Sequence, residues 1–246
     1  MARVRVGTCG WQYRDWRPAF YPPSIPTGQW LRAYALTFDT VECDNAFYRL
    51  PEKDTFAKWA QAVPAGFAMA VKASRFLTHI KRLADPQEPV HRLMAHCEGL
   101  GDHLGPVLLQ LPPNLRADAD KLDQALAAFP AFARVAVELR HPSWFSSAIR
   151  GVLERRRAAL VWADRHGRPV APLWQTTDWG YVRLHEGFAD PWPTYGDTAL
   201  RTWLRRIDNT FTVQADVFFY FNNDPGAAAI RNARTLQRLA TATARR

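Results

Sequence analysis

Residues 135–140 read Val-Ala-Val-Glu-Leu-Arg, and this alternation of bulky with small or charged residues decides the fold class. Successive side chains of a strand point to opposite faces, so the aliphatic residues share one face and Glu138 and Arg140 lie on the other. Helices that cover a parallel sheet require bulky apolar residues on the covered face. The stretch therefore predicts a strand of a helix-covered parallel sheet, with Glu138 and Arg140 directed away from the helices.

Runs of the same kind recur along the chain, and most are followed by a longer stretch of helical composition. This alternation is typical of consecutive βα units and therefore of a parallel sheet. The eight expected strands are Val4–Thr8, Phe38–Glu42, Phe67–Lys72, Val107–Leu111, Val135–Arg140, Leu160–Asp164, Tyr181–His185 and Val217–Asn222. The expected helices are Gly28–Leu36, Pro51–Ala62, Val90–Leu100, Ala117–Phe129, Ser146–Arg156, Asp197–Ile207 and Pro225–Ala240.

Eight strands in a chain of 246 residues favour one (β/α)8, or TIM-type, barrel. Neither repeats nor flexible linkers divide the sequence, so a single domain over residues 1–246 is expected. Only the sixth unit lacks a clear helix, because its connection, Arg165–Thr177, is short and contains Pro169 and Pro172. A doubly wound open sheet is the alternative, and the absence of a GxGxxG motif after the first strand weakens it.

Applied to the other strands, the same alternation predicts polar side chains on the inner face at the carboxyl ends. Active sites of TIM barrels lie at that end and draw on several strands. A structural ion-pair network that plugs the barrel is the alternative, since buried charge is costly to hold. Besides Glu138 and Arg140, the residues expected there are Thr40, Glu42, Lys72, Gln110, Asp164, Tyr181, Arg183, His185 and, with a weaker pattern, Tyr220 and Asn222.

The expected cluster mixes carboxylates with cations, which points to an enzyme that uses acid–base chemistry on an anionic substrate, either phosphorylated or derived from nucleic acid. Glu138 and Asp164 lie on consecutive strands, where proximity can raise one carboxyl pKa and make a general acid. Glu42 supplies a second carboxylate and His185 a proton shuttle. Guanidinium groups grip carboxylates or phosphates bidentately, so Lys72, Arg140 and Arg183 are expected to clamp an anion. The same cations would repel a metal ion, and no metal is expected.

Two alternatives remain open. A non-catalytic binder of nucleic acid or another anion would use the basic composition, a net charge of +9 with a pI of about 9.9, although an Arg-rich solvated face explains that charge equally well. A glycosidase-like hydrolase would place two carboxylates across a sugar ring, but three cations argue against a neutral sugar. No cofactor or protein partner is indicated.

Two further segments offer ligand contacts. Asp224 is expected to cap a helix that begins at Pro225, where barrels often bind phosphate. The loop from Gly10 to Pro26 carries Trp11 with several other aromatic and basic residues and is long enough to fold over the barrel mouth, as a stacking lid or as a hydrophobic seal. Cys9, at the end of the first strand, is expected to be a small buried residue rather than a nucleophile.

The three cysteines, Cys9, Cys43 and Cys97, match neither a disulfide framework nor a metal pattern and indicate a reducing compartment. The N-terminus lacks an apolar signal segment, and no stretch approaches the ~20 apolar residues of a membrane span. A cytoplasmic protein without a membrane partner is therefore expected.

Motifs in a fixed order make the sequence resemble, almost end to end, the domain of unknown function 72 (YecE-like) family. They read GTCGWQYRDW from Gly7, TVECDNAFYRLP from Thr40, VKASRFLTH from Val71, LGPVLLQLPP from Leu104, VELRHPSW from Val137, YVRLHE from Tyr181 and FYFNND from Phe219. The resemblance implies a TIM barrel and no established activity. Its motif positions include Trp11, Tyr48, Thr78, His79 and Asp224 beside the residues named above.

The chain departs from the family pattern at a few of these positions. Cys9 stands where members usually carry Ser, Asp44 and Ala46 replace the usual Asn and Thr, and Glu186 replaces a usual Gly. The resemblance therefore does not support a ligand contact from the second loop. The complete prediction is catalytic Glu42, Glu138, Asp164 and His185, with substrate contacts from Lys72, Gln110, Arg140, Arg183, Tyr48, Trp11, Asn222 and Asp224.

Overall fold

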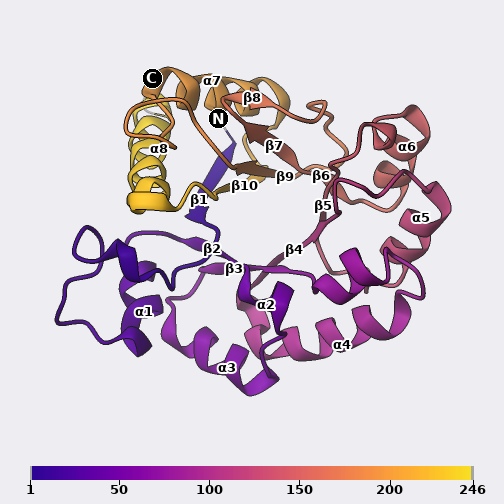
Figure 1. The fold of residues 1–246 in the computed structure, drawn as a ribbon, viewed down its shortest axis with the longest axis horizontal. Coiled ribbons are helices and arrows are strands. Elements are labelled where there is room, and N and C mark those ends of the chain that lie inside the picture. The colour runs from indigo at the N-terminus through magenta and orange to yellow at the C-terminus, as the bar shows by residue number, and fades with distance from the viewer. Residues whose placement is uncertain (1, 245–246) are drawn as a thin grey trace.

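Parallel strand pairing organises the computed structural model, which describes residues 2–244 (Figure 1). One sheet has the order β1-β10-β9-β7-β8 and the other the order β2-β3-β4-β5-β6, and β7 and β8 pair antiparallel while the other paired strands are parallel. Strands occur at all eight expected places. They are β1 (Arg3–Thr8), β2 (Thr40–Cys43), β3 (Ala68–Lys72), β4 (Leu104–Gln110), β5 (Val135–Glu138), β6 (Ala159–Leu160), β7 (Trp162–Arg165), β8 (Arg168–Pro169), β9 (Gly180–Leu184) and β10 (Asp216–Phe221).

Helices surround the strands in Figure 1, with α3 and α4 along the lower edge, α5 and α6 at the right and α7 and α8 at the upper left. Each of the seven expected helices is present, and a short extra one, α2, follows β2. Their bounds are α1 (Trp30–Ala35), α2 (Asn45–Tyr48), α3 (Lys53–Ala62), α4 (Gln87–Cys97), α5 (Ala119–Ala127), α6 (Ser147–Arg155), α7 (Asp197–Thr210) and α8 (Ala228–Ala244). No helix in the described part of the chain is long and apolar enough to cross a membrane.

Local sequence explains where these helices begin and which face they bury. The side chains of Asp118 and Ser146 cap α5 and α6 by accepting a hydrogen bond from a backbone N–H in the first turn. In α7, Leu200, Trp203 and Ile207 recur at helical spacing and are all buried. The burial of this stripe fixes α7 against the sheet and leaves its arginines outside.

The sixth connection has no helix, as expected, and begins with a β-hairpin. Arg165 of β7 pairs with Arg168 of β8 across His166 and Gly167, which both have positive φ angles, +53° and +66°. Two positive φ values define the hairpin turn whose twist matches that of the flanking strands. The hairpin places Arg165 and Val170 beside the carboxyl ends of β5 and β9, where both line a pocket with Glu138 and His185.

Two apolar clusters lie on opposite faces of the strands. The larger one fills the space between strands and helices, and it includes Val137, Val182 and Met69. The smaller one lies on the inner face and contains Ala70, Leu108, Ala136, Ala163, Tyr181 and Tyr220 with five others. The alternation read from the sequence is therefore correct for β3, β4, β5, β9 and β10.

The two sheets meet at two places. At one, β1 and β2 approach closely, the residue after β1 forms a parallel bridge to Glu42, and the N–H of Gly10 donates to the Glu42 carbonyl at 2.8 Å. A Cβ atom on Gly7 would lie 2.2 Å from the carbonyl oxygen of Thr40, so only glycine permits this approach. At the other, the chain passes from β6 to β7 through Val161, whose N–H donates to Val137 at 3.0 Å.

Candidate functional site

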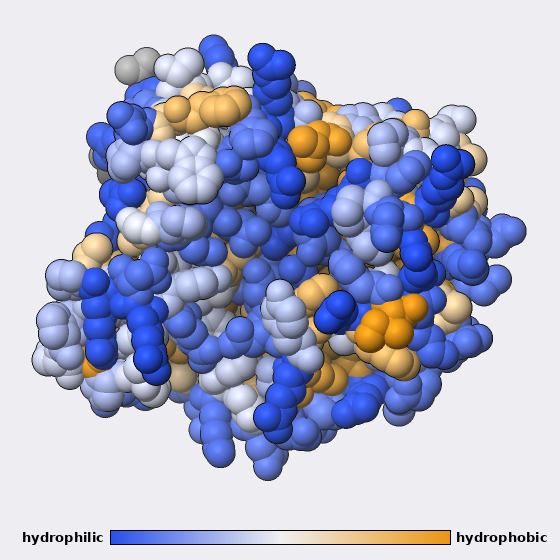
Figure 2. All heavy atoms as spheres, viewed as in Figure 1, coloured by the Kyte–Doolittle hydropathy of each residue, from blue (hydrophilic) through white to orange (hydrophobic). Residues whose placement is uncertain are grey.

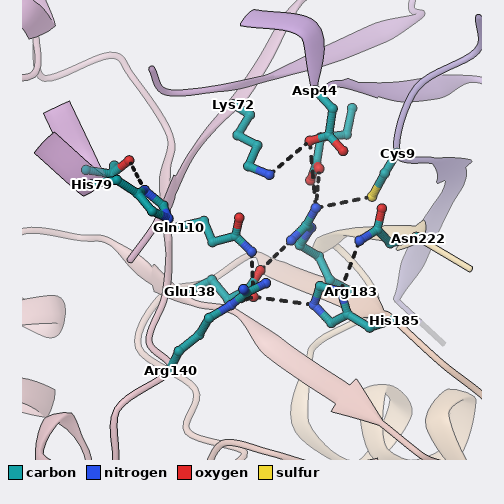
Figure 3. Close-up of polar contacts among 12 residues, drawn as sticks. Cys9, Asp44, Lys72, His79, Gln110, Glu138, Arg140, Arg183, His185 and Asn222 are labelled. Carbon is teal, nitrogen blue, oxygen red and sulfur yellow. Dashed lines mark hydrogen bonds and ion pairs between the residues drawn. The ribbon is translucent and has the colours of Figure 1, made fainter. Parts of the chain in front are cut away.

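A buried guanidinium, that of Arg183, lies at the centre of the polar groups shown in Figure 3. β9 directs Arg183 to the inner face, where its side chain is 0% exposed. Its Nη1 donates to Glu138 Oε2 at 2.5 Å, and its Nη2 donates to Glu42 Oε1 at 2.7 Å. One cation thus bridges carboxylates from β2 and β5, which are far apart in the sequence.

The carboxylate of Glu138 is surrounded by nitrogen atoms from four side chains. Besides Arg183, it faces Arg140 Nε at 2.8 Å, Gln110 Nε2 at 3.0 Å and His185 Nε2 at 3.3 Å, all at Oε1. Burial by itself would raise the pKa of Glu138, but Arg183, His185 and Arg140 hold that pKa well below its usual range. Glu138 is therefore a permanent anion that organises its neighbours, and it is poorly suited to accept a proton.

Glu42 has the opposite character. Its Oε2 accepts a 2.5 Å hydrogen bond from the hydroxyl of Tyr181. Burial raises the pKa of Glu42 to about 7, and Asp44 adds to the rise while Arg183 opposes it. The negative charge of Asp44 disfavours ionisation of Glu42, so Glu42 is the carboxyl group of this pair that takes up a proton first.

Asp44 connects this pair to the mouth of the site. Its side chain is 22% exposed, and its Oδ1 lies 3.4 Å from Lys72 Nζ. Burial tends to raise the pKa of Asp44, but Lys72 and Arg183 hold it below its usual range. Lys72 also lies over the ring of Phe47 of α2, 4.5 Å from its centroid.

His79 lies near Lys72 and Arg140 and adds a polar group beside the mouth. His79 follows Thr78, whose Oγ1 lies 2.9 Å from the His79 Nδ1. Burial, then Lys72 and Arg140, lower the pKa of His79. Figure 2 shows hydrophilic residues gathered near the centre of the viewed face.

A pocket of about 220 Å³ opens beside Glu138, on the side away from Glu42. It lies among the carboxyl ends of β5, β7 and β9 and the hairpin of the sixth connection. Its lining residues are Pro113, Glu138, Leu139, Arg140, Ala163, Arg165, Val170 and His185.

Three potential metal ligands, Cys9, Glu42 and Asp44, have donor atoms within 4.8 Å of one another. Arg183 Nη2 already lies among them, 3.4 Å from the sulfur, 2.7 Å from Glu42 and 3.8 Å from Asp44. Burial raises the pKa of the Cys9 thiol well above its usual range, which disfavours the thiolate that a metal needs. The guanidinium therefore takes the position that a bound cation would need.

The inward placement predicted for Asp164 is wrong. Ala163 lies on the inner face, and Asp164 lies in the outer layer, where Tyr195 Oη donates to it at 2.8 Å and Trp203 Nε1 at 3.3 Å. These two donors satisfy a buried carboxylate among the helices. The polar character of Asp164 did not indicate the inner face of this strand, because the outer layer supplies hydrogen-bond donors of its own. Asp164 is therefore not part of the cluster.

The structure separates the other predicted contacts. Trp11 is 3% exposed and packs edge-to-face on Trp59 of α3, so its role as a stacking surface over the mouth was also predicted wrongly. Tyr48 lies at the end of α2 and is 81% exposed, outside the buried cluster. Asn222, in contrast, lies in the site, where its Nδ2 is 3.1 Å from His185 Nδ1.

Asp224 precedes the turn that leads into α8, as expected, but its side chain caps nothing. Burial raises the pKa of Asp224 to about 8, while the Tyr13 hydroxyl opposes the rise and Asp44 adds to it. Asp224 therefore belongs to the acidic side of the mouth, with Glu42 and Asp44.

Sequence reasoning missed Asp44, Cys9 and Tyr181 as members of the site. Tyr181 was placed on the inner face without a role, and Cys9 was correctly expected to be buried. Asp44 was set aside because it departs from the family pattern, although it directly follows a strand whose end was already implicated. A carboxylate within two residues of Glu42 was the available signal.

These features define a class of protein, an α/β fold of parallel strands with a buried ion-pair network at their carboxyl ends. The chain belongs to the family described as protein of unknown function DUF72, which it matches over residues 5–246. No curated protein matches it significantly.

Solved structures with the same fold include two members of this family. A DUF72 protein of Thermotoga maritima has a TM-score of 0.85 at 24% identity, covering 97% of this chain and 99% of that one. A DUF72 protein of Enterococcus faecalis has a TM-score of 0.80 at 20% identity, covering 97% and 95%. SacUVDE is more distant, with a TM-score of 0.59 at 9% identity over 99% of each chain. At these identities the similarity supports the fold alone.

Proposed function

We propose that this protein is an enzyme that acts on an anionic substrate, with the Glu42–Asp44 pair as its acid and base. The observation that carries the proposal is the pKa of Glu42, raised to about 7 beside the partly exposed Asp44. General acid–base catalysis is most efficient when a group titrates near the working pH. Glu42 stores the proton, and Asp44 passes it to or from the substrate.

The charge of the mouth supports an anionic substrate. Arg183 is neutralised by Glu42 and Glu138, so it holds the site together rather than clamping a ligand. Lys72 and Arg140, with side chains 11% and 28% exposed, remain in reach of a substrate. Their charges would hold a carboxylate or phosphate group beside Asp44.

A glycosidase arrangement has less support. The guanidinium of Arg183 lies between Glu42 and Glu138 and contacts both, which leaves no room for a sugar ring between these carboxylates. A non-catalytic anion binder has the same cations available, and the experiment below separates it from an enzyme.

We further propose that the eight strands form one closed (β/α)8 barrel within a single domain. The supporting contacts are the bridge from Cys9 to Glu42 and the passage of the chain through Val161 between the sheets. A cytoplasmic location is proposed as well, since Cys9, Cys43 and Cys97 are all free thiols.

The test is turnover by the wild-type protein of a panel of phosphate monoesters and of esters that carry a free carboxylate, followed by Glu42→Gln. We expect the variant to lose ~10²- to 10⁴-fold in turnover, because general acid–base catalysis contributes about that much. Asp164→Asn is the control, since it alters a buried carboxylate outside the cluster. Anion binding without turnover in the wild type, unchanged in Glu42→Gln, would assign the protein to the binders instead.

A further inference from the structure

The pocket beside Glu138 does not include Glu42, which lies on the other side of Arg183. Its floor is formed by the ends of β5 and β9, and the hairpin of β7 and β8 borders it. Two arginines, Arg140 and Arg165, line it from different strands.

Both arginines have donors left for a ligand. Arg140 binds Glu138 through Nε, so its two terminal nitrogens stay available. The side chain of Arg165 makes no ion pair or hydrogen bond within residues 2–244. Two positive charges against the one negative charge of Glu138 give the lining a net charge of +1, which matches a monoanion.

His185 adds a directed donor. Its side chain is only 8% exposed, and its Nε2 lies 3.3 Å from Glu138 Oε1 without forming a well-aligned hydrogen bond to any described residue. The Asn222 amide lies 3.1 Å from Nδ1, so Nδ1 accepts from it and the ring proton resides on Nε2. A buried N–H group without a well-aligned hydrogen bond is uncommon in proteins, and a ligand carboxylate in the pocket would give this group an acceptor.

The remaining walls are apolar and the volume is small. Pro113, Ala163 and Val170 contribute side chains without hydrogen-bonding groups. The volume of about 220 Å³ lies below the ~300 Å³ at which pockets begin to hold drug-sized ligands. A nucleic-acid strand or a polyhydroxylated body would leave its polar groups unsatisfied against these walls.

We infer that this pocket binds a small monocarboxylic acid with an apolar body, its carboxylate held by Arg140, Arg165 and His185 Nε2. The inference goes beyond the proposed function, because the pocket does not include Glu42 or Asp44. A phosphate group shares the guanidinium chemistry, but the apolar walls and the single net positive charge favour the carboxylate.

The test is a binding titration of the full chain, by NMR or calorimetry, with three probes: benzoate, its neutral analogue benzamide and inorganic phosphate. We expect benzoate to bind, and benzamide and phosphate to bind at least tenfold more weakly (about 1.4 kcal/mol). Arg165→Gln should weaken benzoate binding about tenfold or more, because a hydrogen bond to a charged group is lost. Arg168→Gln is the matched control, since Arg168 pairs with Arg165 in the hairpin but does not line the pocket.

Equal effects of Arg165→Gln and Arg168→Gln would overturn the inference, and so would phosphate binding as tightly as benzoate. Benzoate should also shift the NMR signals of His185, which a purely electrostatic surface effect would leave in place. If benzoate fails to bind while turnover of another anion depends on Glu42, the inference falls and the proposed function stands.

Discussion

The two sides of Arg183 differ sharply although the same guanidinium contacts both. Glu42 and Glu138 are both buried, and each accepts one Arg183 nitrogen, at 2.7 Å and 2.5 Å. The pKa of Glu138 is held well below its usual range and that of Glu42 is raised to about 7. The number and charge of the other neighbours, and not burial itself, make one carboxyl a fixed anion and the other a proton carrier.

The largest effect is expected from removing the group that both sides share. Arg183→Leu leaves two carboxylates buried without their common cation, so we expect a loss of about 3–5 kcal/mol in the free energy of unfolding. Chemical denaturation at neutral pH measures it.

Arg183→Lys serves as the comparison, because it keeps the charge but cannot contact both carboxylates with two separate nitrogens. It should retain part of the stability. A fully stable Arg183→Leu protein would show that the two sides do not depend on one cation.

Glu42 and Glu138 should also differ in how they make stability depend on pH. The pKa of Glu42 is raised in the folded state. Its contribution to the free energy of unfolding is therefore complete at a pH below the ordinary pKa of 4.5, and it is lost as the pH rises through about 7. Over that interval the loss amounts to roughly 3 kcal/mol, at ~1.4 kcal/mol per unit. Glu138 acts in the opposite sense, since its depressed pKa gives stability that is lost as the pH falls below the ordinary value of 4.5.

Glu42→Gln should therefore flatten the decline of unfolding free energy between pH 4.5 and 7 and leave the acid limb unchanged. Urea denaturation across this range checks it. An identical decline of the unfolding free energy in Glu42→Gln would mean that Glu42 does not titrate in this pH range.

The smallest effect is expected at Gln110, one of the three side chains that donate a hydrogen bond to Glu138. Gln110→Ala removes a hydrogen bond to a charged group, but the arginines and His185 remain, so we expect about 1 kcal/mol of destabilisation. Gln124→Ala, at an exposed position of α5, is the control and should change little. A loss several times larger would show that Gln110 also positions its neighbours.

Sequence alone could place the strands and most of their inner faces, because period-two alternation is a local property of the chain. Lys72, Glu138 and Arg183 fall on the inner face for that reason. The partners of Asp164 come from Tyr195 and Trp203, which are 31 and 39 residues away, and no local pattern reveals donors in an outer layer.

Roles within the site were harder to foresee than positions. Arg183 was expected to clamp a ligand, and only its contacts show that carboxylates from two other strands neutralise it. A cationic side chain on the inner face can bind a ligand only if carboxylates from neighbouring strands do not already neutralise it. The role of Asp44 depends in the same way on Lys72, which comes from β3.

Gly7 lies outside the charged cluster but controls the distance between two of the strands. Since any larger residue there would collide with the Thr40 carbonyl, the distance between β1 and β2 is set by a missing side chain. Glu42 is carried by the same strand as Thr40, only two residues further on. The position of Glu42, and with it the pKa of its carboxyl group, thus depends on the absence of a side chain at Gly7. A substitution of this glycine would shift that pKa without changing any charged residue.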